Sequence, residues 1–243
     1  MRYLLIIPII ISVFVYFETE AQISLSGSET VEARAYIVYD IRNSKIILSK
    51  NLLAQLPLAS LTKLMTAYVY AEDTGLEKVG NNILCRMLVT SDNRIAEELG
   101  VNLQSKLQIT ANNLGMKQSF FLSSTGLDIS ENLSGAYGSA RDISIVMGRL
   151  YSDYRDLLDC TTKEEYTDEA GLVKNTNKYV GKTVGILGSK TGLTDLAGGN
   201  LAVIIDVEIN RPVIIVVLGS SEEGRFSDIS KLLGMAQAIK IHE

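Results

Sequence analysis

Residues 184–221 read VGILGSKTGLTDLAGGNLAVIIDVEINRPVIIVVLGSS, and this stretch decides the fold. Its segments 184–192, 199–210 and 211–221 are rich in valine and isoleucine and are separated by glycine, asparagine and proline. That composition is typical of β-strands joined by turns. We expect Asn210-Arg211-Pro212 to form the hairpin turn between the last two strands. The stretch therefore predicts consecutive strands of an antiparallel sheet.

The rest of the chain extends this pattern on both sides. Residues 34–40 and 45–49 read as two further strands, joined by a turn over Arg42-Asn43-Ser44. A helix is expected from Gly224 onward, with an apolar stripe. The stripe consists of Ile229, Leu232, Leu233, Met235, Ala236 and Ile239.

The middle of the chain has a mainly helical pattern. One helix is expected from about Ser60 to Glu72, and others between Asn82 and Leu150. In one of them Ser139 is predicted to be the N-cap, with Asp142 reaching back to the backbone of the cap. The predicted fold class is α/β (α+β). An antiparallel sheet is built from both chain ends and flanked by helices, and a mainly helical subdomain is inserted at about 64–180. A site is expected between sheet and subdomain.

Bulk composition excludes several function classes. The 243 residues, 47% hydrophobic and 21% charged, are enough for one sizeable core. The net charge of -5, without any basic stretch, argues against a nucleic-acid partner. Cys85 and Cys160 are too few for a disulfide framework or a zinc site. Their number leaves open whether they pair, and we expect two separate small core residues. No cofactor is expected.

Residues 1–22, MRYLLIIPIIISVFVYFETEAQ, have the layout of a secretory signal. One early positive charge is followed by an apolar run from Tyr3 to Phe17 and then by polar residues. Cleavage after Ala21 and retention as a membrane anchor are both open. Either way, residues 30–243 are expected to form a domain that works outside the cytoplasmic membrane.

The candidate chemistry begins with an exclusion. The sequence has one histidine, His242, next to its last residue, so a Ser-His-Asp triad with a firmly held imidazole is not expected. Lysine is the obvious substitute. Ser60 is the one serine with a lysine three positions on, and residues at that spacing on a helix are neighbours. Lys63 could accept the Ser60 proton if burial or a nearby cation lowered its pKa. The alternative is a helix N-cap followed by a solvated lysine.

Two further motifs could complete such a site. Lys190-Thr191-Gly192 on a predicted strand offers a cation, a hydroxyl and open backbone groups to an extended peptide that ends in a carboxylate. A plain strand end with a turn glycine is the alternative. Ser91-Asp92-Asn93 lies at a break before a helix, where an N-cap cluster would explain these residue types equally well.

Together the three motifs, in this order, resemble the penicillin-recognising serine acyl enzymes, whose motif set is S-x-x-K, S-D-N and K-T-G. Within that superfamily the chain looks most like the D-alanyl-D-alanine carboxypeptidases, the low-molecular-mass penicillin-binding proteins. The resemblance extends from about Ala35 to the terminal helix. It is carried by the stretches ASLTKLMTAYV, STGLD, GSARDIS, GSKTGLTDLAGGNLA and LGSSEEGRF.

The resemblance implies a substrate and a role for each matching residue. The substrate would be a peptidoglycan stem peptide, and β-lactams would be covalent inhibitors. Ser60 would attack the penultimate D-Ala carbonyl and form an acyl-enzyme, with Lys63 taking its proton. Ser91, helped by Lys190, would pass a proton to the leaving D-Ala. The implied substrate-binding residues are Asn93, Lys190, Thr191, Gly192, Leu193 and Arg225. Among them Thr191 and Arg225 would bind the terminal carboxylate, and the N–H of Leu193 would join that of Ser60 in an oxyanion hole. Arg141 would be structural, in an ion pair.

The chain departs from the family in two places. The stretch from Ser60 to Ser91 is much shorter than usual, and Asp92 stands where a small residue is more common. A class A-like β-lactamase remains an alternative, with Glu164 and Glu165 as the candidates for activating the deacylating water. A catalytically weak penicillin-binding or wall-binding module is a second alternative. The sequence does not separate a carboxypeptidase from an endopeptidase.

Overall fold

The structure is a computed structural model that describes residues 30–75 and 81–239. The chain divides into two units, Met1–Thr30 and Val31–Glu243, and every element named below lies in the second. The expected signal or anchor at residues 1–22 lies outside the described residues. Within the described ranges, no helix combines the length and the apolar character needed to cross a bilayer.

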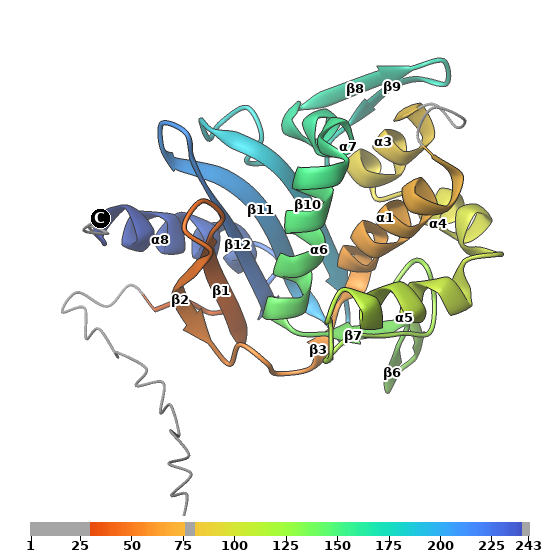
Figure 1. Cartoon of the computed structure of the whole chain (residues 1–243), viewed down its shortest axis with the longest axis horizontal. Coiled ribbons are helices and arrows are strands. Elements are labelled where there is room, and N and C mark those ends of the chain that lie inside the picture. The colour runs from red at the N-terminus through yellow and green to blue at the C-terminus, as the bar shows by residue number, and fades with distance from the viewer. Residues whose placement is uncertain (1–29, 76–80, 240–243) are drawn as a thin grey trace, which may run out of the picture. The chain divides into compact units, whose positions relative to one another are not determined.

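A five-stranded antiparallel sheet forms the centre of this unit, with the strand order β10-β11-β12-β1-β2 (Figure 1). Its strands are β10 (Ile186–Thr194), β11 (Gly198–Glu208), β12 (Arg211–Ser220), β1 (Ala35–Asp40) and β2 (Lys45–Lys50). Strands β1 and β12 pair from Ala35↔Leu218 to Asp40↔Val213, so residues from the two ends of the chain lie side by side. The prediction of a sheet made from both chain ends is confirmed.

The β11–β12 turn lies slightly earlier than predicted. Its two residues are Ile209 and Asn210, and Asn210 has a φ of 58°. Asparagine tolerates this left-handed conformation, which two-residue hairpins require. Arg211 and Pro212 therefore belong to β12 and not to the turn.

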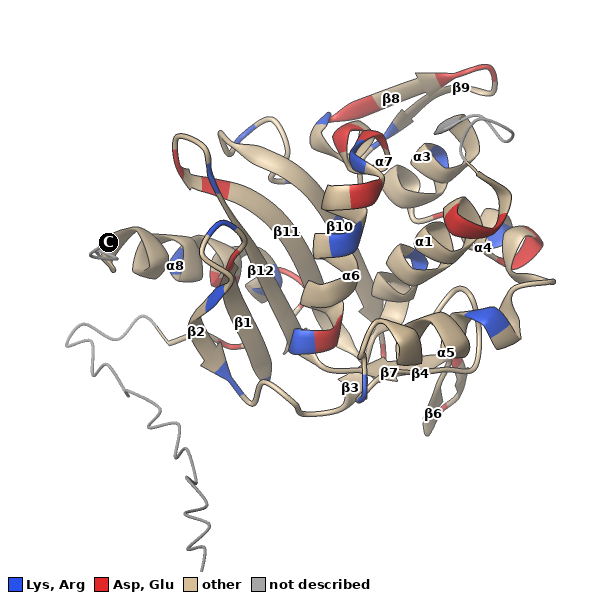
Figure 2. Cartoon of the chain, viewed as in Figure 1, with Lys and Arg blue, Asp and Glu red and all other residues tan. Residues whose placement is uncertain are grey.

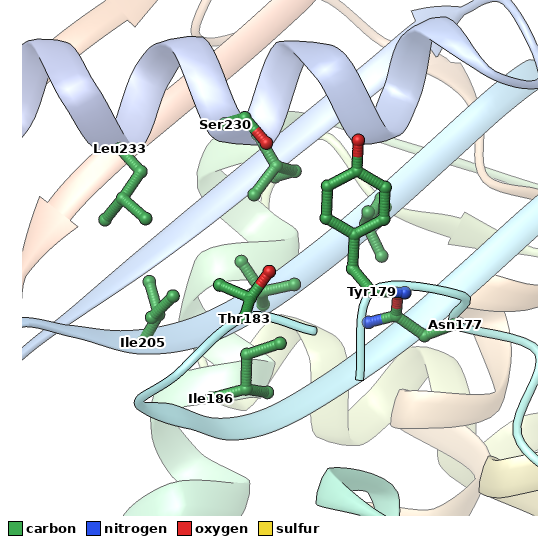
Figure 3. A pocket seen from close by; sticks show the side chains of 10 residues that line it. Asn177, Tyr179, Thr183, Ile186, Ile205, Ser230 and Leu233 are labelled. Carbon is green, nitrogen blue, oxygen red and sulfur yellow. The ribbon is translucent and has the colours of Figure 1, made fainter. Parts of the chain in front are cut away.

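Helices cover both faces of the sheet. Helix α8 (Gly224–Ala238) packs its buried Phe226, Ile229 and Leu232 against alternate residues of β11 and β12, and α6 (Ala140–Asp153) covers the opposite face (Figure 1). Both faces are buried, which is why these strands are continuous apolar runs. Their charged residues lie at the hairpin end (Figure 2). Tyr179 and Ile205 line a small apolar pocket beneath α8 (Figure 3).

The inserted subdomain is mainly helical, as predicted. It contains α1 (Thr62–Thr74), α3 (Asn81–Thr90), α4 (Asn93–Gly100), α5 (Gln104–Asn113) and α7 (Arg155–Asp159), with the 3-10 turns η1 (Ala59–Leu61) and η2 (Cys160–Thr162). Its short strands are β3 (Leu56–Pro57), β4 (Phe120–Phe121), β5 (Asp128–Ser130), β6 (Leu133–Ser134), β7 (Ala136–Gly138), β8 (Glu165–Asp168) and β9 (Gly171–Lys174). Ser60 lies in η1, and α1 begins two residues after the predicted start.

The predicted capping of α6 is half right. The Ser139 hydroxyl accepts a hydrogen bond from the Asp142 N–H at 3.1 Å. The Asp142 carboxylate does not return to the cap; it accepts bonds from the Gln118 N–H at 2.7 Å and from the Ser119 hydroxyl at 2.9 Å. Arg141 forms the expected ion pair, with Asp142 at 3.5 Å.

The expectation of two separate cysteines is wrong. Cys85 in α3 and Cys160 at the start of η2 form a disulfide, with their Cα atoms 5.8 Å apart across a sequence separation of 75. Both residues are buried, as free core cysteines would be. The packing of α3 against η2 brings them within bonding range, and no local sequence pattern reports such a contact.

Candidate active site

Ser60 lies in the 3-10 turn that precedes α1, and the residue is only 8% exposed. The residue before it, Ala59, has a φ of 48°, a conformation that costs energy for any residue with a side chain. Two contacts hold it there. The Thr62 hydroxyl donates to the Ala59 carbonyl at 2.7 Å, and Gly126 lies so close that a Cβ on it would be 2.0 Å from that carbonyl oxygen. Ser60 therefore sits on a strained, tightly supported turn.

Lys63 is fully buried directly behind Ser60. Its Nζ donates to the Ser60 Oγ at 2.9 Å, to the Asn93 Oδ1 at 2.7 Å and to the Thr125 carbonyl at 3.1 Å. Burial lowers the pKa of Lys63 to about 8, against smaller raising effects from the charges of Asp92 and Glu97. The lowered pKa increases the neutral fraction of this amine, whose lone pair can accept the Ser60 proton.

The S-D-N motif forms the junction between α3 and α4. Ser91 has a φ of 60°, and the Asp92 carboxylate caps α4 by accepting from the Ile95 N–H at 3.0 Å. Asp92 is therefore the N-cap of α4, and the side chains of Ser91 and Asn93 are available for other contacts. Asn93 reaches Lys63, while the Ser91 Oγ accepts a bond from the Lys190 Nζ at 2.9 Å.

Lys190 is 1% exposed on β10 and donates a second bond to the Thr191 carbonyl at 2.8 Å. Burial lowers its pKa well below the usual range for lysine, and the positive charges of Lys63 and Arg225 lower it further. Two buried lysines thus contact two serines, Lys63 with Ser60 and Lys190 with Ser91. An anion bound here would relieve the repulsion among these cations.

The K-T-G strand packs directly on the turn that carries Ser60. A Cβ on Gly192 would be 3.1 Å from the Leu58 carbonyl oxygen and 3.3 Å from the Leu61 nitrogen. The Thr191 hydroxyl contacts that of Thr176 at 2.7 Å, and the Arg225 Nη1 donates to the Gly192 carbonyl at 2.8 Å. Arg225 is buried, and burial lowers the pKa of its guanidinium. Leu193 follows at an exposed position.

Three contributions escaped sequence reasoning. The Thr125 carbonyl that accepts from Lys63 is a backbone group, so its residue type carries no signal. Thr176 joins the site from a loop between β9 and β10. Asn200 donates to the Pro57 and Leu58 carbonyls at 3.0 and 3.1 Å and accepts from the Gly219 N–H at 2.8 Å, which ties η1 to the sheet. A polar residue within the apolar run of β11 was the available signal for Asn200.

Two other kinds of functional site, a metal site and an apolar pocket, have less support in the structure. The described residues contain no group of three or more histidine, cysteine, aspartate or glutamate side chains placed to hold a metal ion. The apolar pocket in Figure 3 is lined by none of the candidate site residues. The candidate chemistry is therefore concentrated where η1, α4 and β10 meet: a serine hydroxyl with a lysine of lowered pKa behind it, and a second serine–lysine pair beside it.

Comparisons with known proteins agree with this arrangement. The family model described as D-alanyl-D-alanine carboxypeptidase matches residues 20–101 and 101–222. The D-alanyl-D-alanine carboxypeptidase DacA of Escherichia coli (strain K12) is 26% identical over 252 residues, covering 86% of this chain and 62% of the relative. A D-alanyl-D-alanine endopeptidase of Pseudomonas aeruginosa is 30% identical over 237 residues, 81% of this chain and 74% of the relative.

Solved structures share the fold. Penicillin-binding protein D2 from Listeria monocytogenes, in its cefotaxime-bound form, matches with a TM-score of 0.78 and 26% identity, covering 86% of this chain and 98% of that one. The architecture is thus that of the penicillin-binding DD-peptidases. This chain spans 62% of the length of the E. coli relative. Since the family model matches most of the sequence, the chain belongs to the D-alanyl-D-alanine carboxypeptidase family.

Proposed function

We propose that this chain is a serine-type D-Ala-D-Ala carboxypeptidase that removes the terminal D-Ala from peptidoglycan stem peptides through an acyl-enzyme on Ser60. The observation that carries the proposal is the buried Lys63 amine, 2.9 Å from the Ser60 Oγ, with a pKa near 8. A base of this kind can take the serine proton without histidine.

Acylation follows from the contacts at the two serines. Ser60 Oγ attacks the carbonyl carbon of the penultimate D-Ala while Lys63 Nζ takes its proton. The C–N bond then breaks, and the leaving D-Ala nitrogen receives a proton from the Ser91 Oγ. Lys190 Nζ, which lies 2.9 Å from that oxygen, gives Ser91 a new proton. The N–H groups of Ser60 and Leu193 would stabilise the oxyanion in this step.

Deacylation returns the enzyme to its starting state. Before the water attacks, Lys63 releases to solvent the proton that it took from Ser60, and Lys190 regains one from solvent. A water molecule then attacks the ester carbon and gives a proton to the neutral Lys63 as the new bond forms. The bond to Ser60 Oγ breaks, and the serine regains a proton from Lys63. One water is consumed, and the shortened peptide leaves with a new carboxylate.

The substrate assignment rests on charge and on the edge strand. Lys63, Lys190 and Arg225 are all buried, which favours a substrate that carries a negative charge. Among the strands that the structure describes, β10 pairs with β11 alone, so its other edge can pair with an extended peptide. Asn93 would hold the substrate amide, Lys190-Thr191-Gly192 its backbone, and Thr191 and Arg225 its terminal carboxylate. A β-lactam would acylate Ser60 in the same position; the similar Listeria monocytogenes structure is a cefotaxime-bound form.

The remaining assignments concern the domain and its location. Residues 30–243 would be the catalytic domain, with the helical subdomain at about 64–180, and residues 1–22 a signal or an anchor that attaches it to the membrane. The domain would act outside the cytoplasmic membrane, without a nucleic-acid partner. The Cys85–Cys160 disulfide supports this location, because such bonds persist mainly in oxidising compartments.

The decisive experiment incubates the purified chain with a peptide ending in D-Ala-D-Ala and measures free D-Ala. We expect release by the parent and none by Ser60→Ala. Release that persists in Ser60→Ala would contradict the nucleophile assignment. A parent that binds penicillin covalently but releases no D-Ala would indicate a penicillin-binding module without turnover.

A β-lactamase is the weaker enzyme alternative. The Glu164 carboxylate lies against Gly181, where a Cβ would be 2.0 Å from its Oε1, and Glu165 begins the β8–β9 hairpin. The hydrogen bonds of Ser60 and Lys63 involve neither residue. Nitrocefin separates the two activities: a long-lived covalent adduct supports the peptidase, and rapid multiple turnover contradicts it.

An endopeptidase that cuts cross-links is the second candidate, because the Pseudomonas aeruginosa relative at 30% identity carries that name. Arg225→Gln distinguishes the two. Loss of the charged group should reduce kcat/KM for a substrate ending in a free carboxylate by roughly ten- to hundred-fold, the worth of one charged hydrogen bond. Equal rates on the parent's preferred cross-linked substrate before and after the change would favour the endopeptidase.

A further inference from the structure

The position of Ser91 depends on helix α3. Ser91 directly follows Thr90, the last residue of α3, and its backbone has a φ of 60°. Its hydroxyl must meet Lys190, which lies on β10 in the central sheet, and the distance between Ser91 Oγ and Lys190 Nζ is 2.9 Å. The contact between Ser91 and Lys190 therefore depends on the interactions that hold α3 in position relative to β10.

A disulfide and two sets of polar contacts attach α3 to the segment 155–176. Cys85, in the middle of α3, is bonded to Cys160. Arg86 next to it forms an ion pair with Asp168 of the β8–β9 hairpin at 3.2 Å. Nearer Ser91, the Val89 carbonyl accepts from the Thr176 N–H at 3.0 Å. Among these, the disulfide is the one covalent attachment.

Residues next to Cys160 contact β10 immediately before Lys190. Thr161, the residue after Cys160, accepts from the Ser189 N–H at 2.9 Å and receives a weaker bond from the Ser189 hydroxyl at 3.4 Å. The adjacent Gly188 lies so close to Leu158 that a Cβ there would be 2.9 Å from the leucine Cβ. Leu158 and Thr161, which flank Cys160 in the sequence, thus both contact β10.

These connections close a ring. It runs from Ser91 back along α3 to Cys85, across the disulfide to η2, from Thr161 to Ser189, and through Lys190 back to Ser91. We infer that the Cys85–Cys160 disulfide is a positioning pair that holds Ser91 against Lys190 for proton delivery to the leaving group. The inference rests on the proposed function of that contact. The sulfur atoms touch no reacting group and act through Ser91 alone.

The first test is the oxidation state. Thiol titration of the denatured full chain should find no free thiol, and two thiols per chain would overturn the inference. The second test removes the bond with C85A/C160A and with C85V/C160A, in which valine fills more of the space that sulfur leaves. Each pair is made in the parent and in a Ser91→Ala background.

The readout is the rate of acylation by a fluorescent penicillin, together with kcat and KM for D-Ala release. In the parent background, loss of the disulfide should slow acylation by roughly ten- to hundred-fold, the usual cost of a misplaced catalytic group, with kcat falling more than KM changes. In the Ser91→Ala background the loss should be about two-fold or less, because the group being positioned is gone. Equal losses in both backgrounds would overturn the inference and leave the disulfide a purely structural bond.

Two controls separate positioning from stability. Leu232→Ala removes a buried side chain of α8 that belongs to a different buried cluster from Cys85 and Cys160, so it should destabilise the fold without slowing acylation at a temperature where it is folded. The second control is the parent chain reduced with dithiothreitol, which needs no substitution. Its disulfide yields two cysteine thiols and one oxidised dithiothreitol. The same loss of rate is expected, with recovery on reoxidation, and a reduced chain as fast as the oxidised one contradicts the inference.

Hydrogen exchange tests the same idea without requiring activity. Amides of α3 and Ser91 should exchange faster in the double variants than in the parent, while those of α8 stay unchanged. A parent that is neither acylated nor releases D-Ala would refute the proposed function, and exchange would then still decide the positioning. Unchanged exchange in α3 would overturn it.

Discussion

Lys63 combines full burial with three hydrogen-bond partners, so its proton is easily lost but its amine stays in place. Because the neutral form accepts the Ser60 proton, the rate of acylation should rise as pH rises through about 8, as long as Lys190 keeps the proton that it passes to Ser91. The measurement is a pH profile of acylation by a penicillin whose own charge is constant over this range. A flat profile between about pH 6.5 and 9.5 would contradict a base of this pKa.

The free energy of unfolding should also increase with pH because of Lys63. The pKa of Lys63 is about 8 in the folded chain against an ordinary value of 10.5, so the unfolded chain binds more protons between these values. The contribution of Lys63 to the free energy of unfolding therefore increases with pH across that window and is lost as pH falls through about 8. Lys63→Met, which has no proton to bind, should lack this contribution in urea titrations.

Asp92 influences the same protonation equilibrium from the N-terminus of α4. Its charge raises the pKa of Lys63, and its carboxylate caps α4 at the Ile95 N–H. Asp92→Asn keeps a capping oxygen but removes the charge, so the rising limb of the acylation profile should move to lower pH. Glu98→Gln, an exposed change on the same helix, is the matched control and should leave the limb in place. A limb that does not move in Asp92→Asn would show that this carboxylate does not influence Lys63.

At the scale of elements, the approach of β10 to η1 sets the geometry around Ser60. Gly192→Ala would place a Cβ 3.1 Å from the Leu58 carbonyl oxygen and push the strand away by a few tenths of an ångström. We expect the acylation rate to fall by roughly ten-fold or more, with a loss of about 1–3 kcal/mol in the free energy of unfolding. Acylation kinetics and urea denaturation measure the two effects.

Gly234→Ala on α8 is the matched control for that substitution. A Cβ there has no neighbour within 4 Å. Alanine in place of glycine inside a helix should raise the free energy of unfolding by about 0.5–1 kcal/mol and leave acylation unchanged. If Gly192→Ala behaved like Gly234→Ala, the tight contact between β10 and η1 would have no part in the reaction.

Elements with a strong periodic signal could be predicted from the sequence, and their ends less well. The Val/Ile runs of β11 and β12 and the stripe of α8 were placed correctly because burial on one or both faces imposes those patterns. The turn at Ile209-Asn210 was misplaced because Pro212 looks like a turn residue, although it lies in β12. The start of α1 shifted because Ser60 belongs to a 3-10 turn that packing against Gly126 and Gly192 maintains.

For the molecule as a whole, contacts between distant segments were the part that sequence reasoning missed. The three motifs fixed the order of Ser60, Ser91 and Lys190, but the disulfide joins residues 75 positions apart, and two buried cysteines look the same whether or not they pair. Asn200 and Thr176 were missed for the same reason, since each acts on a group far from it in sequence.

Asp228 shows how the two ends of the chain are held together. It is fully buried in α8, and its carboxylate accepts bonds from the Glu32 and Ala33 N–H groups at 2.9 and 2.8 Å and from the Ser220 hydroxyl at 2.7 Å. One side chain therefore fastens the segment before β1, the end of β12 and the terminal helix. Asp228→Asn replaces an acceptor-only group with one that has a single acceptor oxygen, so at least one buried donor loses its partner.

We expect Asp228→Asn to lower the free energy of unfolding by about 2–4 kcal/mol, more than one neutral hydrogen bond is worth, because these bonds are charge-assisted and buried. Urea denaturation measures the loss. Asp159→Asn, in an exposed pair with Arg155 at 3.9 Å, should change stability by about 0.5 kcal/mol or less. At temperatures where Asp228→Asn is folded, acylation of Ser60 should keep the parent's rate, since the groups that bond to Asp228, on Glu32, Ala33 and Ser220, are not among those that contact Lys63 and Lys190. A loss of stability as small as that of Asp159→Asn would mean that strand pairing between β1 and β12 alone keeps the chain ends together.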